Sequence, residues 1–377
     1  MKIKIKKFFF IFTNIIITLF LFEFSLRFLT PFPLNDGSNV IDDINLVYKM
    51  SRTAEKEIDI RGFRNKKDRF NDYDIAAIGD SHTYGWNTIP ENSWPQILEK
   101  KTGKKIYNFG VGSYNIYQFF YLATENIERN KSLIIQIGPT QDFVNYHNFS
   151  RQSDFWVKHN RNMKLDLFSN TLIRKNNIRP LNKIQKFKIL LKNNIATISL
   201  FDHYLWNNYL KQKDDKQNYI NKNNIYLGQE LGFINKTRLE SIKENTNSNN
   251  IHIQKNIYNF EKFLIYFNQN IEKNKIMFSI FPTRERIYYE YLLYHNKKID
   301  RYFEKIIKNE IEFEKKIINL IKRYDYIVVN ASPYILSEFN KFKDKKNFYP
   351  DEDHPNPIGY EMIAESILQN KNFFYEQ

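Results

Sequence analysis

A serine early in the chain and a histidine near its end are the side chains that acyl transfer requires. Ser81 closes the tripeptide Gly79-Asp80-Ser81, and His354 follows Asp351-Glu352-Asp353. A serine hydroxyl becomes a nucleophile when an imidazole accepts its proton and a carboxylate orients that imidazole. One backbone turn would bring Asp351 to the Nδ1 atom of His354, whereas the adjacent Asp353 is predicted to point away. These residues therefore predict a Ser81–His354–Asp351 triad.

Each half of this pattern also has a purely structural interpretation. Gly-Asp-Ser occurs in ordinary loops, where the serine bonds its own turn. Asp-x-x-His in front of a helix can be a capped helix terminus. The surrounding residues favour the catalytic interpretation, because residues 74–78 are almost all apolar and directly precede the tripeptide. Such a run is typical of a strand buried in a parallel sheet, and α/β folds bind ligands where these strands end.

Strand-like and helix-like segments alternate through much of the chain. Short apolar runs predict further strands, and apolar residues three and four apart predict helices. The expected strands are 74–78, 105–109, 133–137, 276–281 and 326–329, and the expected helices begin near Ser93 and cover 116–129, 251–270 and 305–323. The last helix is expected to start at Asn356, as its N-cap, with Pro357 in the first turn. This alternation indicates a parallel α/β sheet with right-handed crossovers.

Three blocks of residues together resemble the SGNH (GDSL-type) hydrolases, a family of esterases, lipases and carbohydrate deacetylases. The blocks are Gly79-Asp80-Ser81-His82-Thr83-Tyr84-Gly85, Asn108-Phe109-Gly110-Val111-Gly112-Ser113, and the Asp351-x-x-His354 motif. The resemblance implies a flavodoxin-like three-layer α/β/α sandwich with a central parallel sheet. It also implies that Ser81 is the nucleophile, His354 the base and Asp351 the orienting acid.

The same resemblance implies an oxyanion hole made by Ser81, Gly112, Ser113 and Gln141. Ser113 stands where the family carries a glycine, whose backbone N–H points at the oxyanion. Gln141 stands where the family carries an asparagine when Gly138-Pro139-Thr140-Gln141-Asp142 is counted back from Asp142. Counting forward from Gly138 puts Thr140 there instead. Each oxyanion donor contributes roughly 3–4 kcal/mol, so these departures bear directly on activity.

The N-terminus is predicted to cross a membrane. Lys2, Lys4, Lys6 and Lys7 precede an apolar segment that continues to Leu29. A helix over residues 8–29 would rise about 33 Å, which is enough to span a hydrocarbon core. Glu23 and Arg27 are four residues apart and can pair or snorkel near the far interface. The basic flank predicts a single-pass protein of the cytoplasmic membrane, with the N-terminus inside and the rest outside. A cleaved signal peptide is the alternative.

The chain divides into three expected parts. Residues 1–30 form the transmembrane signal anchor, residues 31–71 a linker and pre-domain segment, and residues 72–377 the hydrolase-like domain. A helical insertion rich in Asn and Lys is expected at about 146–250. Its aromatic residues Tyr204, Trp206 and Tyr209 are interpreted as core packing, or alternatively as a substrate wall.

Composition excludes several kinds of site. The chain has no cysteine, which excludes disulfides and thiolate chemistry. The net charge of +15 is spread along the sequence without a nucleic-acid-binding motif, so no nucleic-acid partner is expected. The histidines form none of the usual zinc spacings, so neither a metal site nor a cofactor is expected. Arg284, after the fourth predicted strand, is expected to be a surface arginine, or else to hold an anionic or sugar group.

Taken together, the sequence predicts an ester hydrolase acting outside the cytoplasmic membrane on an ester-bearing substrate such as an acylated carbohydrate. The same triad could instead pass an acyl group to a hydroxyl of an extracytoplasmic polysaccharide, because water exclusion around the acyl-enzyme separates the two reactions. The third alternative is a non-catalytic protein of the same fold, which Ser113 and Gln141 favour.

Overall fold

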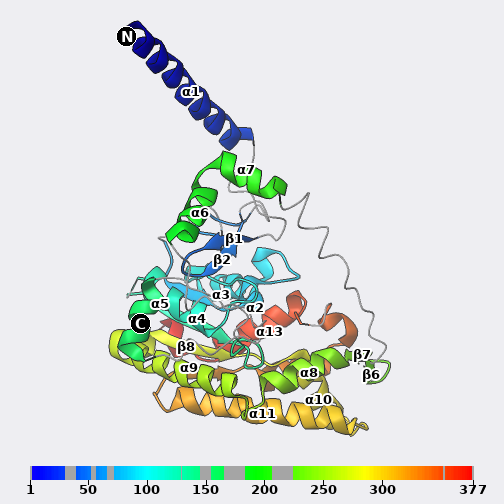
Figure 1. The fold of residues 1–377 in the computed structure, drawn as a ribbon. Helices are drawn as coiled ribbons and strands as arrows, with labels where there is room; N and C mark the ends of the chain where they lie inside the picture. Colours follow the sequence, from blue (N-terminus) through cyan, green and yellow to red (C-terminus); the bar gives the residue numbers. More distant parts are fainter. Residues whose placement is uncertain are drawn as a thin grey trace.

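The computed structural model describes residues 2–29, 40–51, 57–65, 72–128, 130–144, 154–164, 183–205, 224–350 and 353–375. Figure 1 shows a long N-terminal helix standing off a layered α/β body. The first part of the expected linker and pre-domain segment, residues 31–39, lies outside the described residues, as do Trp206, Tyr209 and Asp351.

Five parallel strands form the central sheet, as the alternating sequence pattern predicts. They are β3 (Ile75–Ile78), β4 (Ile106–Asn108), β5 (Ser132–Ile137), β8 (Ile276–Ile280) and β9 (Ile327–Asn330), in the order β4-β3-β5-β8-β9. If these five strands are numbered 1 to 5 in chain order, their order across the sheet is 2-1-3-4-5, as in flavodoxin-like folds. The chain reverses its direction across the sheet between β3 and β5, so the end of β3 lies at the topological switch point.

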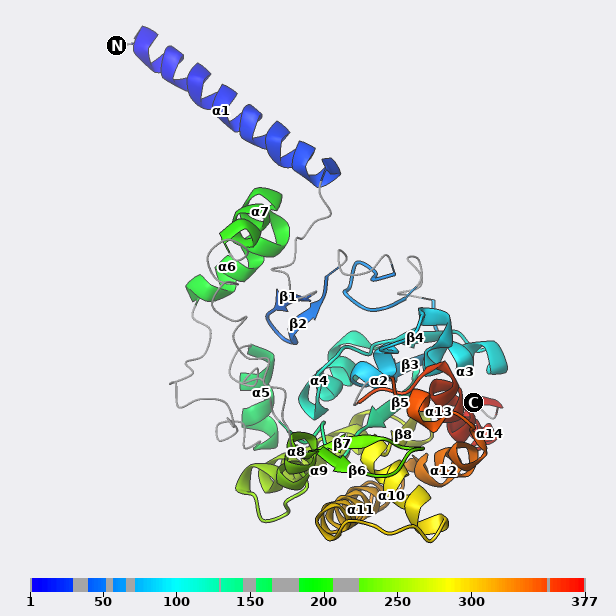
Figure 2. The same ribbon diagram turned by 90° about the vertical axis from the view of Figure 1, so that its right-hand side faces the viewer.

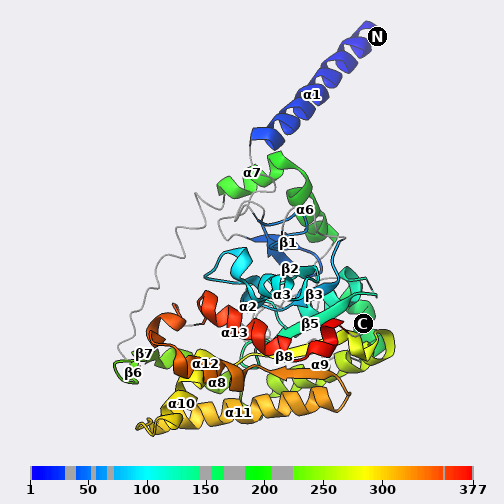
Figure 3. The same cartoon turned by 180° about the vertical axis from the view of Figure 1, so that it is seen from behind.

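Helices cover both faces of the sheet, because alternate residues of each strand point to opposite sides. Ala76 and Ile78 of β3 face a core shared with α4 and α9, whereas Ile75 and Ala77 face a core shared with α3 and α13. Figure 3 shows the second face, with α12 and α13 in front of the strands. The covering helices are α3 (Trp94–Thr102), α4 (Ile116–Tyr121), α9 (Ile251–Asn270), α10 (Arg284–Tyr294), α11 (Arg301–Lys322), α12 (Ser332–Lys341) and α13 (Pro357–Leu368). The protein is therefore a three-layer α/β/α sandwich.

Two helix predictions need correction, and two further helices were not predicted. The helix expected over residues 116–129 ends as an α-helix at Tyr121 and continues as a π-helical turn, Leu122–Asn126. The Thr124 hydroxyl donates to the carbonyl groups of Phe120 and Tyr121, and such bonds back to the preceding turn distort a helix. Asn356 does cap α13, but a short α14 (Lys371–Tyr375) follows it. Helices α10 and α12 were not expected from the sequence.

Two antiparallel hairpins lie outside the central sheet. The first, β1 (Val40–Asp43) with β2 (Val47–Met50), falls in the segment expected to be a linker and pre-domain region. The second, β6 (Asn224–Tyr226) with β7 (Phe233–Asn235), precedes α8 (Lys236–Asn245). Between β5 and these strands lie α5 (Asp154–Met163), α6 (Lys183–Asn194) and α7 (Ala196–Leu205).

The N-terminal helix α1 (Lys2–Leu29) extends away from the body, and α7 lies beside its C-terminal end (Figures 1 and 2). Its segment Phe9–Leu26 is long and apolar enough to cross a membrane, and 6% of it is buried by the rest of the protein. A signal sequence has the same properties, so length and composition establish one apolar N-terminal helix and no more.

Candidate active site

Ser81 sits on the tight turn between β3 and the short helix α2 (Ser81–Tyr84). Asp80 caps this helix, and its carboxylate accepts the backbone N–H of His82 at 2.9 Å. Two glycines allow the turn to pack closely. A Cβ on Gly79 would lie 2.1 Å from Oγ1 of Thr83, and one on Gly110 would lie 2.2 Å from the backbone nitrogen of Tyr84. The sequence thus places a partly exposed serine at the switch point of the sheet, where α/β folds bind ligands.

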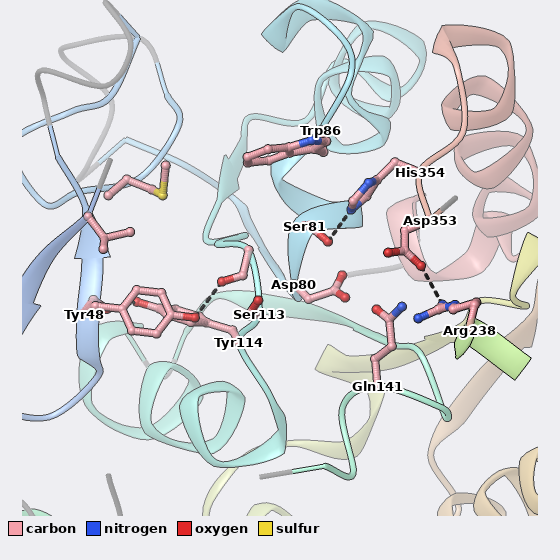
Figure 4. A pocket seen from close by; sticks show the side chains of 13 residues that line it. Tyr48, Asp80, Ser81, Trp86, Ser113, Tyr114, Gln141, Arg238, Asp353 and His354 are labelled. Carbon is pink, nitrogen blue, oxygen red and sulfur yellow. Dashed lines mark hydrogen bonds and ion pairs between the residues drawn. The ribbon is translucent and has the colours of Figure 1, made fainter. Parts of the chain in front are cut away.

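Ser81 and His354, 273 residues apart in sequence, are in direct contact. The Ser81 Oγ and His354 Nε2 atoms are 2.7 Å apart, which is hydrogen-bonding distance for a nucleophile and its base (Figure 4). The backbone N–H of Asn356 donates to the Phe348 carbonyl at 2.8 Å, and the Asn356 side chain caps α13. The end of the His354 loop is therefore fixed to the body, and the proximity expected from the sequence is observed.

Of the two aspartates that precede His354, the structure describes only Asp353. Asp351 lies outside the described residues, so its role as the orienting acid stays a prediction. Asp353 turns its side chain to Arg238 of α8, with Oδ1 2.7 Å from Nη2. Arg238 is also 3.9 Å from Oε2 of the buried Glu285, on α10. The guanidinium thereby ties the loop that carries His354 to α8 and α10.

His82, the residue after the serine, bridges both halves of the site. Its Nδ1 atom lies 3.2 Å from Oδ1 of Asp80, and its Nε2 atom lies 3.0 Å from the backbone carbonyl oxygen of Asp353. A carbonyl oxygen and a carboxylate oxygen only accept hydrogen bonds, so both ring nitrogens must donate. A neutral imidazole has a single N–H, and only the imidazolium satisfies both contacts. His82 is therefore held as a cation between the serine turn and the backbone next to His354.

The charges of this buried group are consistent with its geometry. Burial alone would lower the pKa of His82, but the Asp80 carboxylate outweighs it and raises that pKa. Burial likewise opposes ionisation of Asp80, but the charge and hydrogen bonds of His82 lower its pKa. Burial and the Asp80 charge raise the pKa of Asp142 well above its usual range. The arrangement thus favours an ionised Asp80, a cationic His82 and a protonated Asp142.

Gln141, expected as an oxyanion donor, lies between two charged groups in the same pocket (Figure 4). The amide orientation that satisfies both of its ends lets the nitrogen donate to Asp80 Oδ2 at 3.1 Å. Its oxygen then accepts from Arg238 Nη2 at 2.9 Å. The longer side chain thus reaches the carboxylate next to Ser81, and Thr140, the other alignment candidate, is buried.

Gly112 and Ser113 form the opposite wall, beside Ser81. A Cβ on Gly112 would lie 3.9 Å from Cβ of Ser81. Ser113 has φ of +61°, a left-handed conformation that glycine adopts more readily than other residues. Tyr48 of β2 holds this turn, because its hydroxyl donates to the Gly112 carbonyl at 2.6 Å and also bonds the Ser113 side chain. Burial and the Asp80 charge raise the pKa of Tyr48, which keeps this phenol protonated.

These residues surround one open cavity of about 520 Å³. Its polar side carries Asp80, Gln141, Arg238 and Asp353, with Ser81 and His354 at the centre. Tyr48 and Trp86 lie away from this polar side (Figure 4), and Val40 and Met50 also line the cavity. The Trp86 indole is 42% exposed and its ring centroid lies 5.9 Å from that of His354. The cavity can therefore hold a substrate with both polar and apolar groups against the serine.

Sequence reasoning missed several residues that line this cavity. The sequence assigns His82 no role of its own, and Tyr48 and Met50 lie on a hairpin in the segment where a linker and pre-domain region is expected. Arg238 carried one usable signal, since it is the only arginine between residues 180 and 283 of a lysine-rich stretch. A guanidinium offers a planar fork for two acceptors, a task that lysine does not perform. Arg284, expected at the surface, is buried and pairs with Glu285 at 3.0 Å. The Glu285 carboxylate offsets the cost of burying the guanidinium charge.

Within the described residues, no group of three or more His, Asp or Glu side chains could hold a metal ion.

Comparisons with known proteins add little to this geometry. No family model matches the chain, and no curated protein matches it. Among solved structures, one match is a protein from Desulfitobacterium hafniense DCB-2 that is assigned to the lipolytic G-D-S-L family. It has a TM-score of 0.35 and 13% sequence identity, and it covers 78% of this chain and 97% of that chain. So low a TM-score carries no weight, and the function must be inferred from the site.

Proposed function

We propose that this protein is a serine ester hydrolase of the SGNH (GDSL) type. The observation that carries the proposal is the 2.7 Å contact between Ser81 Oγ and His354 Nε2 at the switch point of the sheet. In this proposal His354 accepts the hydroxyl proton while Ser81 attacks the ester carbonyl. His354 then returns the proton to the leaving alcohol, and water releases the acyl group from Ser81. Asp351 is proposed to orient His354.

The tetrahedral intermediate would place its negative charge toward the turn that faces Ser81. The backbone N–H groups of Ser81, Gly112 and Ser113 are the proposed donors, together with the Gln141 amide. The 2.6 Å hydrogen bond from the Tyr48 hydroxyl to the Gly112 carbonyl, and the bond between that hydroxyl and the Ser113 side chain, support a fixed turn. A fixed turn matters because oxyanion donors act by being in place before charge develops.

We also propose an ester-bearing substrate of moderate polarity, for which an acylated carbohydrate is the best candidate. The exposed Trp86 indole offers a flat apolar face beside His354, and Arg238, Asp353 and Gln141 offer polar partners on the other side. Labelling with a serine-directed fluorophosphonate, compared between the wild type and Ser81→Ala, tests the proposed activity. Absence of labelling of the wild type would favour the non-catalytic alternative.

Removing the Gln141 amide is expected to lower kcat about 100-fold with little change in KM, because its hydrogen bond to the oxyanion forms mainly in the transition state. Steady-state kinetics of Gln141→Ala on a short-chain ester measures this. Gln141→Asn keeps the amide on a side chain one methylene shorter and shows how strictly its reach matters. If Gln141→Ala retains wild-type kcat, the amide only bridges Asp80 and Arg238 and does not stabilise the oxyanion.

The proposed location is the outer side of the cytoplasmic membrane, with α1 as a single-pass anchor. The basic residues before the apolar segment support this orientation. A C-terminal reporter that is active only outside the cytoplasm is therefore expected to give signal. A reporter active only in the cytoplasm would reverse the topology. Release of a domain lacking the first 29 residues would replace the anchor by a cleaved signal.

A further inference from the structure

Helices α6 and α7 carry large apolar side chains that the described part of the chain leaves exposed. On α6, Ile184 is 67% exposed and Phe187 is 57% exposed, and on α7, Phe201 is 63% exposed. Ile198 of α7 is also exposed, and Leu190 of α6 is exposed at the edge of a cavity that it shares with the β1–β2 hairpin. The spacing of Ile184, Phe187 and Leu190 puts them on one side of their helix. Exposed patches of this kind mark interaction sites.

The contact between α7 and α1 shows at which level this face lies. Glu23 is three residues before Leu26, the end of the apolar segment, so it lies about 4.5 Å inside that end. Its carboxylate accepts the backbone N–H of Ala196 at 2.6 Å and both the N–H and the hydroxyl of Thr197 at 2.9 Å. These are the first N–H groups of α7, where a negative charge is favoured. If α1 spans a bilayer, the start of α7 lies at the same depth as Glu23.

We propose that α6 and α7 lie in the headgroup region of the outer leaflet, with their exposed apolar side chains buried in lipid. The partner is thus a lipid bilayer, and this rests on the proposed anchoring of the protein by α1. Interfacial helices bury their apolar side chains about 5–10 Å into the boundary with the acyl chains. Glu23 fits this depth, because a carboxylate at the edge of the hydrocarbon core needs polar partners, which α7 supplies.

The charges on α6 match this partner. Lys183, Lys186 and Lys188 share the helix with the exposed Ile184 and Phe187. Lysine side chains beside an apolar face reach the phosphates of the headgroups, and each such charge contributes about 1 kcal/mol of attraction to an anionic surface. These lysines favour a lipid partner over a protein partner, because they lie at the level where α1 would leave the bilayer and headgroup phosphates are present.

The helix pair is also joined to the active site. The Asn193 amide of α6 donates to the Asp42 carbonyl of β1 at 2.6 Å, and Lys192 pairs with the Asp42 side chain at 3.6 Å. The same hairpin contributes Val40, Tyr48 and Met50 to the cavity wall. Docking of α6 and α7 would therefore hold the ester-binding cavity close to the membrane surface, as the arrangement of α1, α7, α6 and the hairpin in Figure 2 illustrates.

The test uses single cysteines in the full chain, which contains none of its own. Phe187→Cys and Phe201→Cys are labelled with an environment-sensitive fluorophore and reconstituted in vesicles of phosphatidylcholine and phosphatidylglycerol that contain spin-labelled lipids. Ile15→Cys, exposed on α1, reports the anchor, and Lys316→Cys, exposed on α11 away from α1, is the matched negative control. Thermal unfolding of each variant confirms that it is folded.

We expect blue-shifted emission at positions 187 and 201, quenched more by a spin label near the headgroup than by one deep in the acyl chains. Position 15 should be quenched by the deep label, and position 316 by neither.

Quenching at position 15 without quenching at 187 and 201 would overturn the proposal and leave the anchor intact. Blue-shifted emission without lipid quenching would overturn it in favour of a second copy of the chain or another protein. Lack of quenching at position 15 would overturn both the anchor and the docking of α6 and α7, whatever the outcome for the esterase activity.

Discussion

Replacing Ser81 by alanine is expected to abolish fluorophosphonate labelling and to lower ester hydrolysis roughly 10⁴-fold or more. The variant removes the atom that forms the acyl bond, so the acyl-enzyme at Ser81 cannot form. His354→Ala should produce a loss of similar size. The double variant should be no worse than either single one, because a nucleophile and its base act as a unit. Ser93→Ala, which removes a buried serine bonded to the Pro90 carbonyl, is the control and should keep its labelling. Labelling that persists in Ser81→Ala would place the nucleophile elsewhere.

The same kinetics assign the acid of the triad. Asp351→Asn should lower kcat by several orders of magnitude, because an amide cannot hold the imidazole in the required tautomer. Asp353→Asn should cost less, since that carboxylate pairs with Arg238 at 2.7 Å and acts on the loop. The opposite ranking of the two variants would make Asp353 the acid and refute the assignment of Asp351.

The sheet could be predicted from the sequence because its strands carry their own signal. Residues 75–78 are all buried, and such apolar runs alternating with helical patterns leave few other arrangements. The contact of Ser81 with His354 could be expected only from the chemistry of the two residues and from the resemblance to a known family, since 273 residues separate them. No local pattern carries that information.

The remaining parts of the pocket depend on tertiary contacts that single segments do not encode. Strands β1 and β2 are four residues each, and their residues are mixed in character, so they read as a linker. The sequence singles out Arg238 as a lone arginine in a lysine-rich stretch, but its partner Asp353 is evident only after α8 has been placed against the loop of His354. The sequence offers Arg27 as a partner for Glu23. The structure adds the start of α7, which lies 173 residues later and which no local pattern connects to Glu23.

His82 is the second residue on which activity is expected to depend strongly, although it lies outside the predicted triad. It acts as a positioning residue, because its two hydrogen bonds fasten the backbone next to His354 to the serine turn. His82→Gln can preserve at most part of this bridge. A misplacement of about 1 Å can cost 10²-fold in rate, so kcat should fall about 10- to 100-fold with a smaller change in KM. His159→Gln, which changes a buried histidine bonded only locally to the Phe155 carbonyl, is the matched control.

The pH dependence separates this positioning role from a loss of folding. The groups that face His82 are the Asp80 carboxylate, Asp353 and the His354 ring, whose centroid lies 5.1 Å away, with the apolar Phe281 ring on another side. Since the pKa of His82 is raised in the folded protein, the stability it contributes is complete below its ordinary value of 6.5. That contribution is lost as the pH rises through the raised value. The pKa of Asp80 is lowered, so its contribution is present above its ordinary value of 3.8 and is lost as the pH falls through the lowered one.

Wild-type kcat should therefore decline on the alkaline side as His82 loses its proton and one of its two bonds. His82→Gln has no such proton to lose, so its lower activity should lack this decline, and its deficit in unfolding free energy should shrink as the pH rises. Both are measured by kinetics and chemical denaturation between about pH 5 and 10, a range chosen to bracket the ordinary histidine pKa. If the variant kept the alkaline decline with undiminished kcat, His82 would be a packing residue. The imidazolium argued from its two acceptors would then have no part in holding His354 against Ser81.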